Sequence, residues 1–228
     1  MSQEKILVVE DDTELNSIIC NYLKKEGYAV DTAFNGREGI EIARKQKPDL
    51  ILLDIMLPET DGLEVCRDIR TYSVAPIVII SAKNSDMDKM LALGIGSDDY
   101  IEKPFSLLEL GARVKSHLRR YKTFSKNTPE NDTIQFGEIT IDTNAHRVIV
   151  CGKEVSLTTR EYELLVYFAE NPSHVFTKEQ LLNRVWGNSD YIDINTITVY
   201  VGRIREKLTQ AGACYIKTVW GAGYKWEM

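Results

Sequence analysis

The chain has 228 residues, 43% hydrophobic and 27% charged, which is typical of a globular protein and long enough for two modest domains. Its net charge of −6 argues against indiscriminate nucleic-acid binding, although Arg203–Lys225 holds five basic side chains and only one acidic one. The longest apolar runs are only strand-sized, which excludes a membrane protein. The first residues show no secretory pattern, and the four cysteines are scattered, so we expect free thiols in a cytoplasmic protein.

Residues 1–121 alternate short apolar runs with amphipathic stretches, the pattern of a parallel sheet covered by helices. The expected strands are Lys5–Glu10, Tyr28–Phe34, Asp49–Ile55, Pro76–Ser81 and Asp99–Lys103. Gly27 ends the first helix, and the last helix opens with a capping box at Ser106–Glu109 and runs to about Tyr121. Right-handed connections predict an α/β, doubly wound (βα)5 domain of strand order 2-1-3-4-5, with its site at the carboxyl ends of the strands.

Residues 122–132 are polar, rich in turn-forming residues and without periodicity, so we expect an interdomain linker there. Residues 133–228 follow a different pattern of short β-runs, three helices and a final hairpin. The first two helices open with the capping boxes Thr158–Glu161 and Thr177–Gln180, and the third covers about Thr196–Gln210. The last two helices and the hairpin predict a winged helix-turn-helix domain.

Polar side chains stand at the ends of four of the five expected strands. They are Glu10 with Asp11, then Asp54, Ser81 and Lys103. We expect them to converge at one edge of the sheet, where clustered carboxylates repel one another unless a hard cation such as Mg²⁺ holds them. Asp54 would then act as a nucleophile toward a phosphoryl group. Lys103 would neutralise the oxygens of that group, and Ser81 would donate a hydrogen bond to one of them.

Motifs over nearly the whole chain resemble the two-component response regulators of the OmpR/PhoB subfamily. The receiver motifs are Val8–Asp12, Leu53–Pro58 with Asp61–Gly62, Ser81–Ala82 and Asp98–Phe105. The effector motifs are Leu157–Thr158 with Glu161 and Leu164–Leu165, then Thr196–Leu208 and Val219–Tyr224. The resemblance implies a transcriptional regulator that a sensor histidine kinase phosphorylates. It would then bind double-stranded DNA as a homodimer, with RNA polymerase as a further partner.

The same resemblance implies roles for individual receiver residues. The implied Mg²⁺ site consists of Glu10, Asp11, Asp54 and the carbonyl of Met56. Asp54 would accept the phosphoryl group, and Ser81 and Tyr100 would rearrange on phosphorylation. A cis peptide before Pro104 would aim Lys103 into the site.

Two alternatives compete with a phosphorylation-switched regulator. A phosphatase of the haloacid-dehalogenase type also uses an aspartyl nucleophile, but it needs a second acid two residues later, where this chain has Met56. A phosphoaspartate should therefore persist as a signal, and we expect no enzyme. A DNA-binding protein with a vestigial receiver would have an incomplete acidic cluster, whereas every required position is filled here. An acidic pair after a strand is also often a helix cap, the role that we assign to Asp12.

The third helix of the second domain carries the expected DNA contacts. Its buried stripe is Ile197, Val201, Ile204 and Leu208. On the opposite side, Arg203 would contact guanine and Val199 a thymine methyl group, whereas a merely solvated helix is the simpler alternative. A wing with basic residues favours DNA. The full expected set is Thr196, Val199, Tyr200, Arg203, Arg205, Lys207, Lys217 and Thr218. Gly202 and Trp220 stand where the family often has basic residues.

Charged residues on the fourth and fifth helices and the fifth strand form the face by which related regulators pair symmetrically. They are Lys89, Asp98, Asp99, Glu109, Arg113, Arg119 and Arg120. The alternative is a solvated surface, where each ion pair contributes only about 0 to 1 kcal/mol. We expect phosphorylation to turn Tyr100 inward and two receivers to associate through this face.

Overall fold

The computed structural model describes residues 3–82, 92, 95–123, 133–186 and 193–228. The chain divides into two compact units, Met1–Tyr121 and Lys122–Met228. Within the described ranges, no helix is both long enough and apolar enough to cross a membrane.

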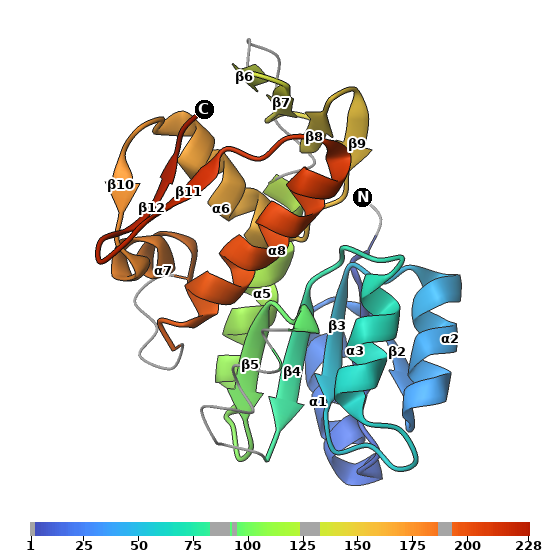
Figure 1. Ribbon diagram of the computed structural model, residues 1–228. Helices are drawn as coiled ribbons and strands as arrows, with labels where there is room; N and C mark the ends of the chain where they lie inside the picture. Colours follow the sequence, from blue (N-terminus) through green and yellow to red (C-terminus); the bar gives the residue numbers. More distant parts are fainter. Residues whose placement is uncertain (1–2, 83–91, 93–94, 124–132, 187–192) are drawn as a thin grey trace. The chain divides into compact units, whose positions relative to one another are not determined.

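The first unit is built on a parallel sheet (Figure 1). Its strands are β1 (Lys5–Val9), β2 (Ala29–Ala33), β3 (Leu50–Asp54), β4 (Ile77–Ser81) and β5 (Asp99–Glu102). They pair in the order β2-β1-β3-β4-β5, which confirms the predicted doubly wound topology. The expected strand bounds differ from these by no more than a residue at either end.

Helices cover both faces of this sheet. They are α1 (Thr13–Lys25), α2 (Gly36–Gln46), α3 (Gly62–Arg70) and α5 (Leu107–Thr123). Helices α1 and α5 pack against one face, and α2 and α3 pack against the other. Strands β3 and β4 are buried on both sides, which is why their sequences are continuous apolar runs without a polar alternation.

The ends of two helices test the expected caps. Asp12 caps α1, since its carboxylate accepts hydrogen bonds from the backbone N–H groups of Glu14 and Leu15 at 2.9 and 3.1 Å. The capping box expected at Ser106 is replaced by another arrangement, because the Glu109 carboxylate accepts hydrogen bonds from Arg113. Helix α5 continues two residues into the expected linker, and residues 124–132 lie outside the described residues.

The second unit is a winged-helix domain (Figure 1). It contains the antiparallel strands β6 (Thr133–Phe136), β7 (Ile139–Asp142), β8 (Arg147–Val150) and β9 (Lys153–Val155), the helices α6 (Thr159–Glu170), α7 (Lys178–Trp186) and α8 (Thr196–Ala211), and the strands β10 (Val175–Phe176), β11 (Ile216–Val219) and β12 (Gly223–Trp226). Both expected capping boxes are present, at Thr158 and at Thr177. Strand β10 is an addition to the expected elements, and it pairs with β12 of the wing.

Candidate functional site

Three carboxylates meet at the carboxyl ends of β1 and β3. Oxygen atoms of Glu10, Asp11 and Asp54 all lie within 4.8 Å of one another. Glu10 and Asp54 are buried, whereas Asp11 is exposed at the rim. The backbone N–H of Met56 donates to Asp54 Oδ1 at 2.8 Å, which holds the Met56 peptide beside the cluster. Because oxygen donors that open to solvent on one side suit an ion that keeps several waters, these residues fit Mg²⁺.

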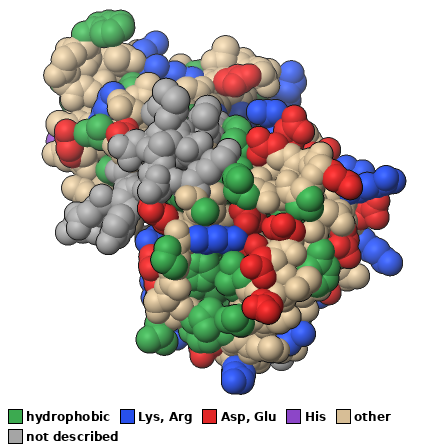
Figure 2. Space-filling model, turned by 90° about the horizontal axis from the view of Figure 1, so that it is seen from below, with side chains coloured by type: hydrophobic (Ala, Val, Ile, Leu, Met, Phe, Trp, Pro, Cys, Tyr) green, Lys and Arg blue, Asp and Glu red, His purple; other side chains and the backbone are tan. Residues whose placement is uncertain are grey.

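The ammonium group of Lys103 joins two of these carboxylates. Its Nζ donates to Glu10 Oε2 at 2.7 Å and to Asp54 Oδ2 at 2.5 Å. The expected cis peptide before Pro104 is present. Burial opposes the charge on Lys103, but the hydrogen bonds to both carboxylates outweigh it and raise the pKa of Lys103. Seen from the strand ends, acidic and hydrophobic side chains gather around a basic one on this face (Figure 2).

Glu10 is the most strongly perturbed carboxyl group of the cluster. Burial raises its pKa to about 7, the hydrogen bond from Lys103 opposes this rise, and the charge of Asp54 adds to it. The carboxyl group of Glu10 therefore carries a proton for much of the time at neutral pH when no other cation is bound. A cation at the cluster would displace that proton.

Two residues to which the sequence analysis assigned no role shape the acidic cluster. Asn16 is buried in α1, and its amide Nδ2 donates to the Glu10 carbonyl at 3.0 Å. Gly62 begins α3 directly against β3, where a Cβ atom would overlap the Asp54 carbonyl oxygen. Glycine is thus required there, because any side chain would push α3 away from β3.

Ser81 and Tyr100 occupy neighbouring strands. Ser81 is fully buried at the end of β4, and its carbonyl accepts a hydrogen bond from the Lys103 N–H at 2.8 Å. Tyr100 is only 9% exposed and packs with Ile79 and Ala92 in the core. The ring of Tyr100 thus already lies inward in this structure, and its rearrangement on phosphorylation stays a prediction.

Helix α8 buries a wider arc than the single expected stripe. The expected stripe is buried, namely Ile197, Val201, Ile204 and Leu208. Thr196 and Tyr200 are also buried, with exposures of 0% and 1%, so their predicted place on the outward face is wrong. The Tyr200 ring packs edge-on against Trp186 of α7, with 4.9 Å between the ring centroids. The cause is that α8 packs against α6 and α7 at once, which covers two adjacent stripes.

The exposed surface of α8 is centred on Thr198 and Gly202. Val199 and Arg203 lie half-buried on one flank, with the Arg203 guanidinium 5.6 Å from the centre of the Tyr200 ring. Thr198 is not among the expected DNA contacts, because those assume a single buried stripe on this helix. A helical wheel that assigns both stripes places Thr198 at the centre of the outward face.

Two basic side chains expected on DNA are bonded within the domain. Arg205 donates from Nε to the Ile216 carbonyl at 3.2 Å and from Nη2 to Thr218 Oγ1 at 2.8 Å. Lys207 Nζ donates to Glu161 Oε2 at 2.6 Å, which fastens α8 to the cap of α6. Arg205 and Lys207 therefore hold α8 against β11 and α6. These internal hydrogen bonds account for both basic residues without a contact to DNA.

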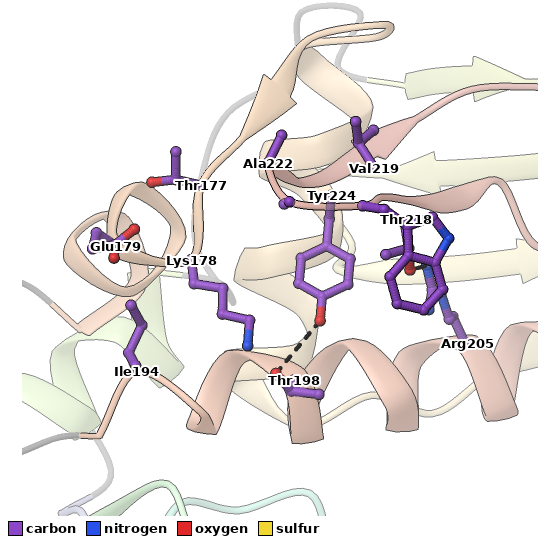
Figure 3. A pocket seen from close by; sticks show the side chains of 13 residues that line it. Thr177, Lys178, Glu179, Ile194, Thr198, Arg205, Thr218, Val219, Ala222 and Tyr224 are labelled. Atoms are coloured by element: carbon purple, nitrogen blue, oxygen red, sulfur yellow. Dashed lines mark hydrogen bonds between the residues drawn. The ribbon is translucent and has the colours of Figure 1, made fainter.

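A groove of about 700 Å³ lies between α8 and the wing strands β11 and β12 (Figure 3). Tyr224 points across it from β12, and its hydroxyl group lies 3.4 Å from Thr198 Oγ1. Lys178, the first residue of α7, extends into the same groove. Lys217 and Thr218 are exposed on β11, as expected. Helix α8, the wing and the groove between them therefore form one continuous surface.

Comparison with known proteins decides the family. The family "Response regulator receiver domain" matches residues 6–115, and "Transcriptional regulatory protein, C terminal" matches residues 152–226. The transcriptional regulatory protein ResD of Bacillus subtilis is 44% identical over 233 residues, which cover 100% of this chain and 97% of ResD. The OmpR/PhoB homologue DrrB of Thermotoga maritima is 30% identical in sequence, with a TM-score of 0.51 and 100% of both chains covered. The chain belongs to the OmpR/PhoB subfamily of two-component response regulators.

Further relatives agree with this assignment. The transcriptional regulatory protein SrrA of Staphylococcus aureus is 42% identical over 234 residues, which cover 100% of this chain and 97% of SrrA. The structure of a RitR mutant is 27% identical with a TM-score of 0.75, covering 98% of this chain and 99% of RitR. This response regulator therefore has a receiver unit and a DNA-binding effector unit, and its relatives regulate transcription.

The expected pairing face of the receiver needs one correction. Asp98 is fully buried, and its Oδ2 accepts hydrogen bonds from Arg70 Nη2 at 2.5 Å and from the Ile77 N–H at 2.9 Å. A carboxylate that is 0% exposed and paired with Arg70 inside the receiver lies out of reach of a partner chain. Asp98 is thus a structural residue that joins α3 to β4, and its prediction as an interface residue is wrong.

Other members of that face form a network within the receiver. Asp99 is 6% exposed and accepts hydrogen bonds from Arg113 at 3.1 Å and from the His117 ring at 3.0 Å. Arg113 also donates to Glu109 at 2.9 Å, and Glu109 itself is exposed on α5. Arg119 is exposed, whereas Lys89 and the Arg120 side chain lie outside the described residues. His117 is a buried member of this network.

Proposed function

We propose that this protein is a phosphorylation-activated transcriptional response regulator. Asp54 accepts a phosphoryl group from a sensor histidine kinase, and the phosphorylated receiver dimerises to bring two effectors to paired DNA half-sites, where RNA polymerase is the downstream partner. The observation that carries the proposal is the Lys103 ammonium between Glu10 and Asp54 in a chain that ends in a DNA-binding unit. We place this activity in the cytoplasm, where a kinase and DNA are both accessible.

Phosphoryl transfer at Asp54 breaks the P–N bond of a phosphohistidine and forms a P–O bond to a carboxylate oxygen. Lys103 neutralises the equatorial oxygens while it keeps its proton, and Ser81 donates a hydrogen bond to one of them. Mg²⁺, when bound by Glu10, Asp11, Asp54 and the Met56 carbonyl, supplies further charge neutralisation. Met56 offers no acid or base for hydrolysis, which favours a lasting signal over a phosphatase.

We expect Mg²⁺ to bind about tenfold more tightly at about pH 8 than at about pH 6. Glu10 has a pKa of about 7 in the folded protein and has to lose its proton to face the cation. Because this pKa is raised above that of the unfolded chain, the protonated form predominates at the lower pH and is lost as the pH rises through about 7. Isothermal calorimetry measures the affinity, and Glu10→Gln should remove most of the pH dependence. Equal wild-type affinities at both pH values would contradict this role for Glu10.

On DNA, we propose that α8 enters the major groove with Thr198, Val199 and Arg203 toward the bases. The groove between α8 and the wing then takes one sugar-phosphate strand, with Lys178 and Lys217 as phosphate contacts. This arrangement is supported by the exposure of Thr198 and by the position of Lys178 in Figure 3. It leaves Arg205 and Lys207 in their internal hydrogen bonds.

Arg203→Ala should weaken binding to the cognate site by about 1 to 3 kcal/mol and relax the preference at one base position. Arg203 lies on the flank of α8 that borders the outward face, and a guanidinium in a major groove can make a bidentate contact with guanine. Selection of duplexes from a random library measures both effects. Lys217→Ala serves as the control, because loss of a phosphate contact weakens all sequences alike. If Arg203→Ala also weakens all sequences alike, Arg203 contacts only phosphate.

A further inference from the structure

Trp220 is the most exposed large hydrophobic residue among the described part of the chain. Its side chain is 92% exposed, whereas Trp186 and Trp226 are buried at 7% and 0%. Exposing an indole ring to water forgoes one of the largest gains that burial offers, so a ring left outside points to a binding role. Trp220 occupies the turn of the wing between β11 and β12.

The turn that carries Trp220 has a fixed geometry. The Ala222 N–H donates to the Val219 carbonyl at 3.0 Å and closes the turn. Gly223 has a φ of +145°, and a Cβ atom there would overlap the Phe176 carbonyl oxygen, so the base of the wing is packed tightly on β10. The indole is therefore presented on a rigid support, and little ordering entropy is lost when it binds.

The electrostatic attraction of the effector to DNA is modest. Residues 133–228 carry 10 basic and 11 acidic side chains. Arg205 and Lys207 are bonded internally, and Lys225 is paired with Glu227 at 2.6 Å. A wing that lacks a basic residue at its tip needs another source of affinity, and the area of an exposed indole supplies it.

We propose that Trp220 is an apolar minor-groove contact, with its indole ring against the deoxyribose walls of double-stranded DNA. The inference rests on the proposed function, because α8 in the major groove leaves the wing over the adjacent minor groove. Trp220 lines the same groove as Thr198 of α8, so a strand that runs along this groove passes from the helix to the indole. Apolar wing contacts of this kind depend on groove shape and little on salt.

Tryptophan emission tests the contact directly, because Trp220 is the exposed indole of the three. The probe is the full-length phosphorylated chain with a two-half-site duplex recovered from a random library. We expect the duplex to change the emission of the wild type and to leave that of Trp220→Phe unchanged, although this variant still binds. An unchanged emission on binding would overturn the inference. So would an emission change that follows protein concentration without DNA, because Trp220 would then contact a second copy.

Binding at several salt concentrations separates an apolar contact from a charged one. Trp220→Ala should weaken binding about tenfold and leave the salt slope unchanged, whereas Lys217→Ala should lower the slope by about one. Trp220→Arg should recover most of the affinity with a slope that is steeper by about one. A Trp220→Ala chain that binds as tightly as wild type overturns the inference alone. A wild-type chain that binds no duplex overturns the proposed function as well.

Discussion

Asp54→Ala should gain no phosphoryl group under conditions in which the wild-type chain gains one. The carboxylate of Asp54 is the acceptor that lies within hydrogen-bonding distance of Lys103 and beside the Met56 N–H. Removing it leaves Lys103 and the other acids without a nucleophile, so the expected loss is complete. Mass spectrometry after incubation with Mg²⁺ and a small phosphodonor measures the yield.

Asp12→Ala is the matched control for this experiment. Asp12 is an acid of the same loop, but its carboxylate caps α1 and does not belong to the acidic cluster. Its loss should cost about 1 kcal/mol of stability and leave phosphorylation intact. An Asp54→Ala chain that is modified in similar yield to the wild type would show that another residue accepts the phosphoryl group.

Phosphorylation should convert the protein from a monomer to a dimer. The network of Asp99, Arg113 and Glu109 holds charged side chains on α5 and β5, and in a symmetric pair each contact made from this face occurs twice. Each exposed ion pair is weak, but several pairs acting together can be switched by a small change in the receiver. Sedimentation of the wild type with and without a phosphodonor measures the conversion.

Charge reversal tests which face pairs. Lys89→Glu should abolish the dimer, because two acidic side chains would then face each other at positions 89 and 109. The double change Lys89→Glu with Glu109→Lys should restore the dimer, because the two charges are opposite again. Arg37→Glu is the control, because it makes the same change in net charge on α2, where the Arg37 side chain is 89% exposed. Persistence of the dimer in Lys89→Glu would place the interface elsewhere.

Most of the receiver fold could be predicted from the sequence, because each buried strand is marked by its own short apolar run. Leu50–Leu53 and Ile77–Ile80 are apolar without alternation, because both faces of their strands are covered. These runs place the strands along the chain. Once the strands are placed, their carboxyl ends have to meet, and the acidic cluster follows. Gly62 also belongs to a predictable motif, although its contact with Asp54 is seen only in the structure.

The misplaced residues depend on contacts between distant segments. Tyr200 has a polar hydroxyl and stands beside the expected stripe, but the Trp186 ring of another helix covers it. Asp98 looks like a surface acid until Arg70 of α3, distant in the sequence, provides its charge partner. Helical periodicity describes one helix against one neighbour, so it does not reveal a second covering helix or a buried ion pair.

The central claim is that phosphorylation acts by bringing two effectors to two half-sites, and a DNA titration tests it most directly. Affinities of phosphorylated and unphosphorylated wild-type protein are compared on duplexes with one and with two half-sites, with Asp54→Ala as the unphosphorylated reference. Coupling two effectors raises the effective concentration of the second one, so we expect phosphorylation to tighten binding about a hundredfold on paired half-sites and only slightly on a single one. Equal enhancement on both duplexes would contradict the account, because the signal would then act within a single effector.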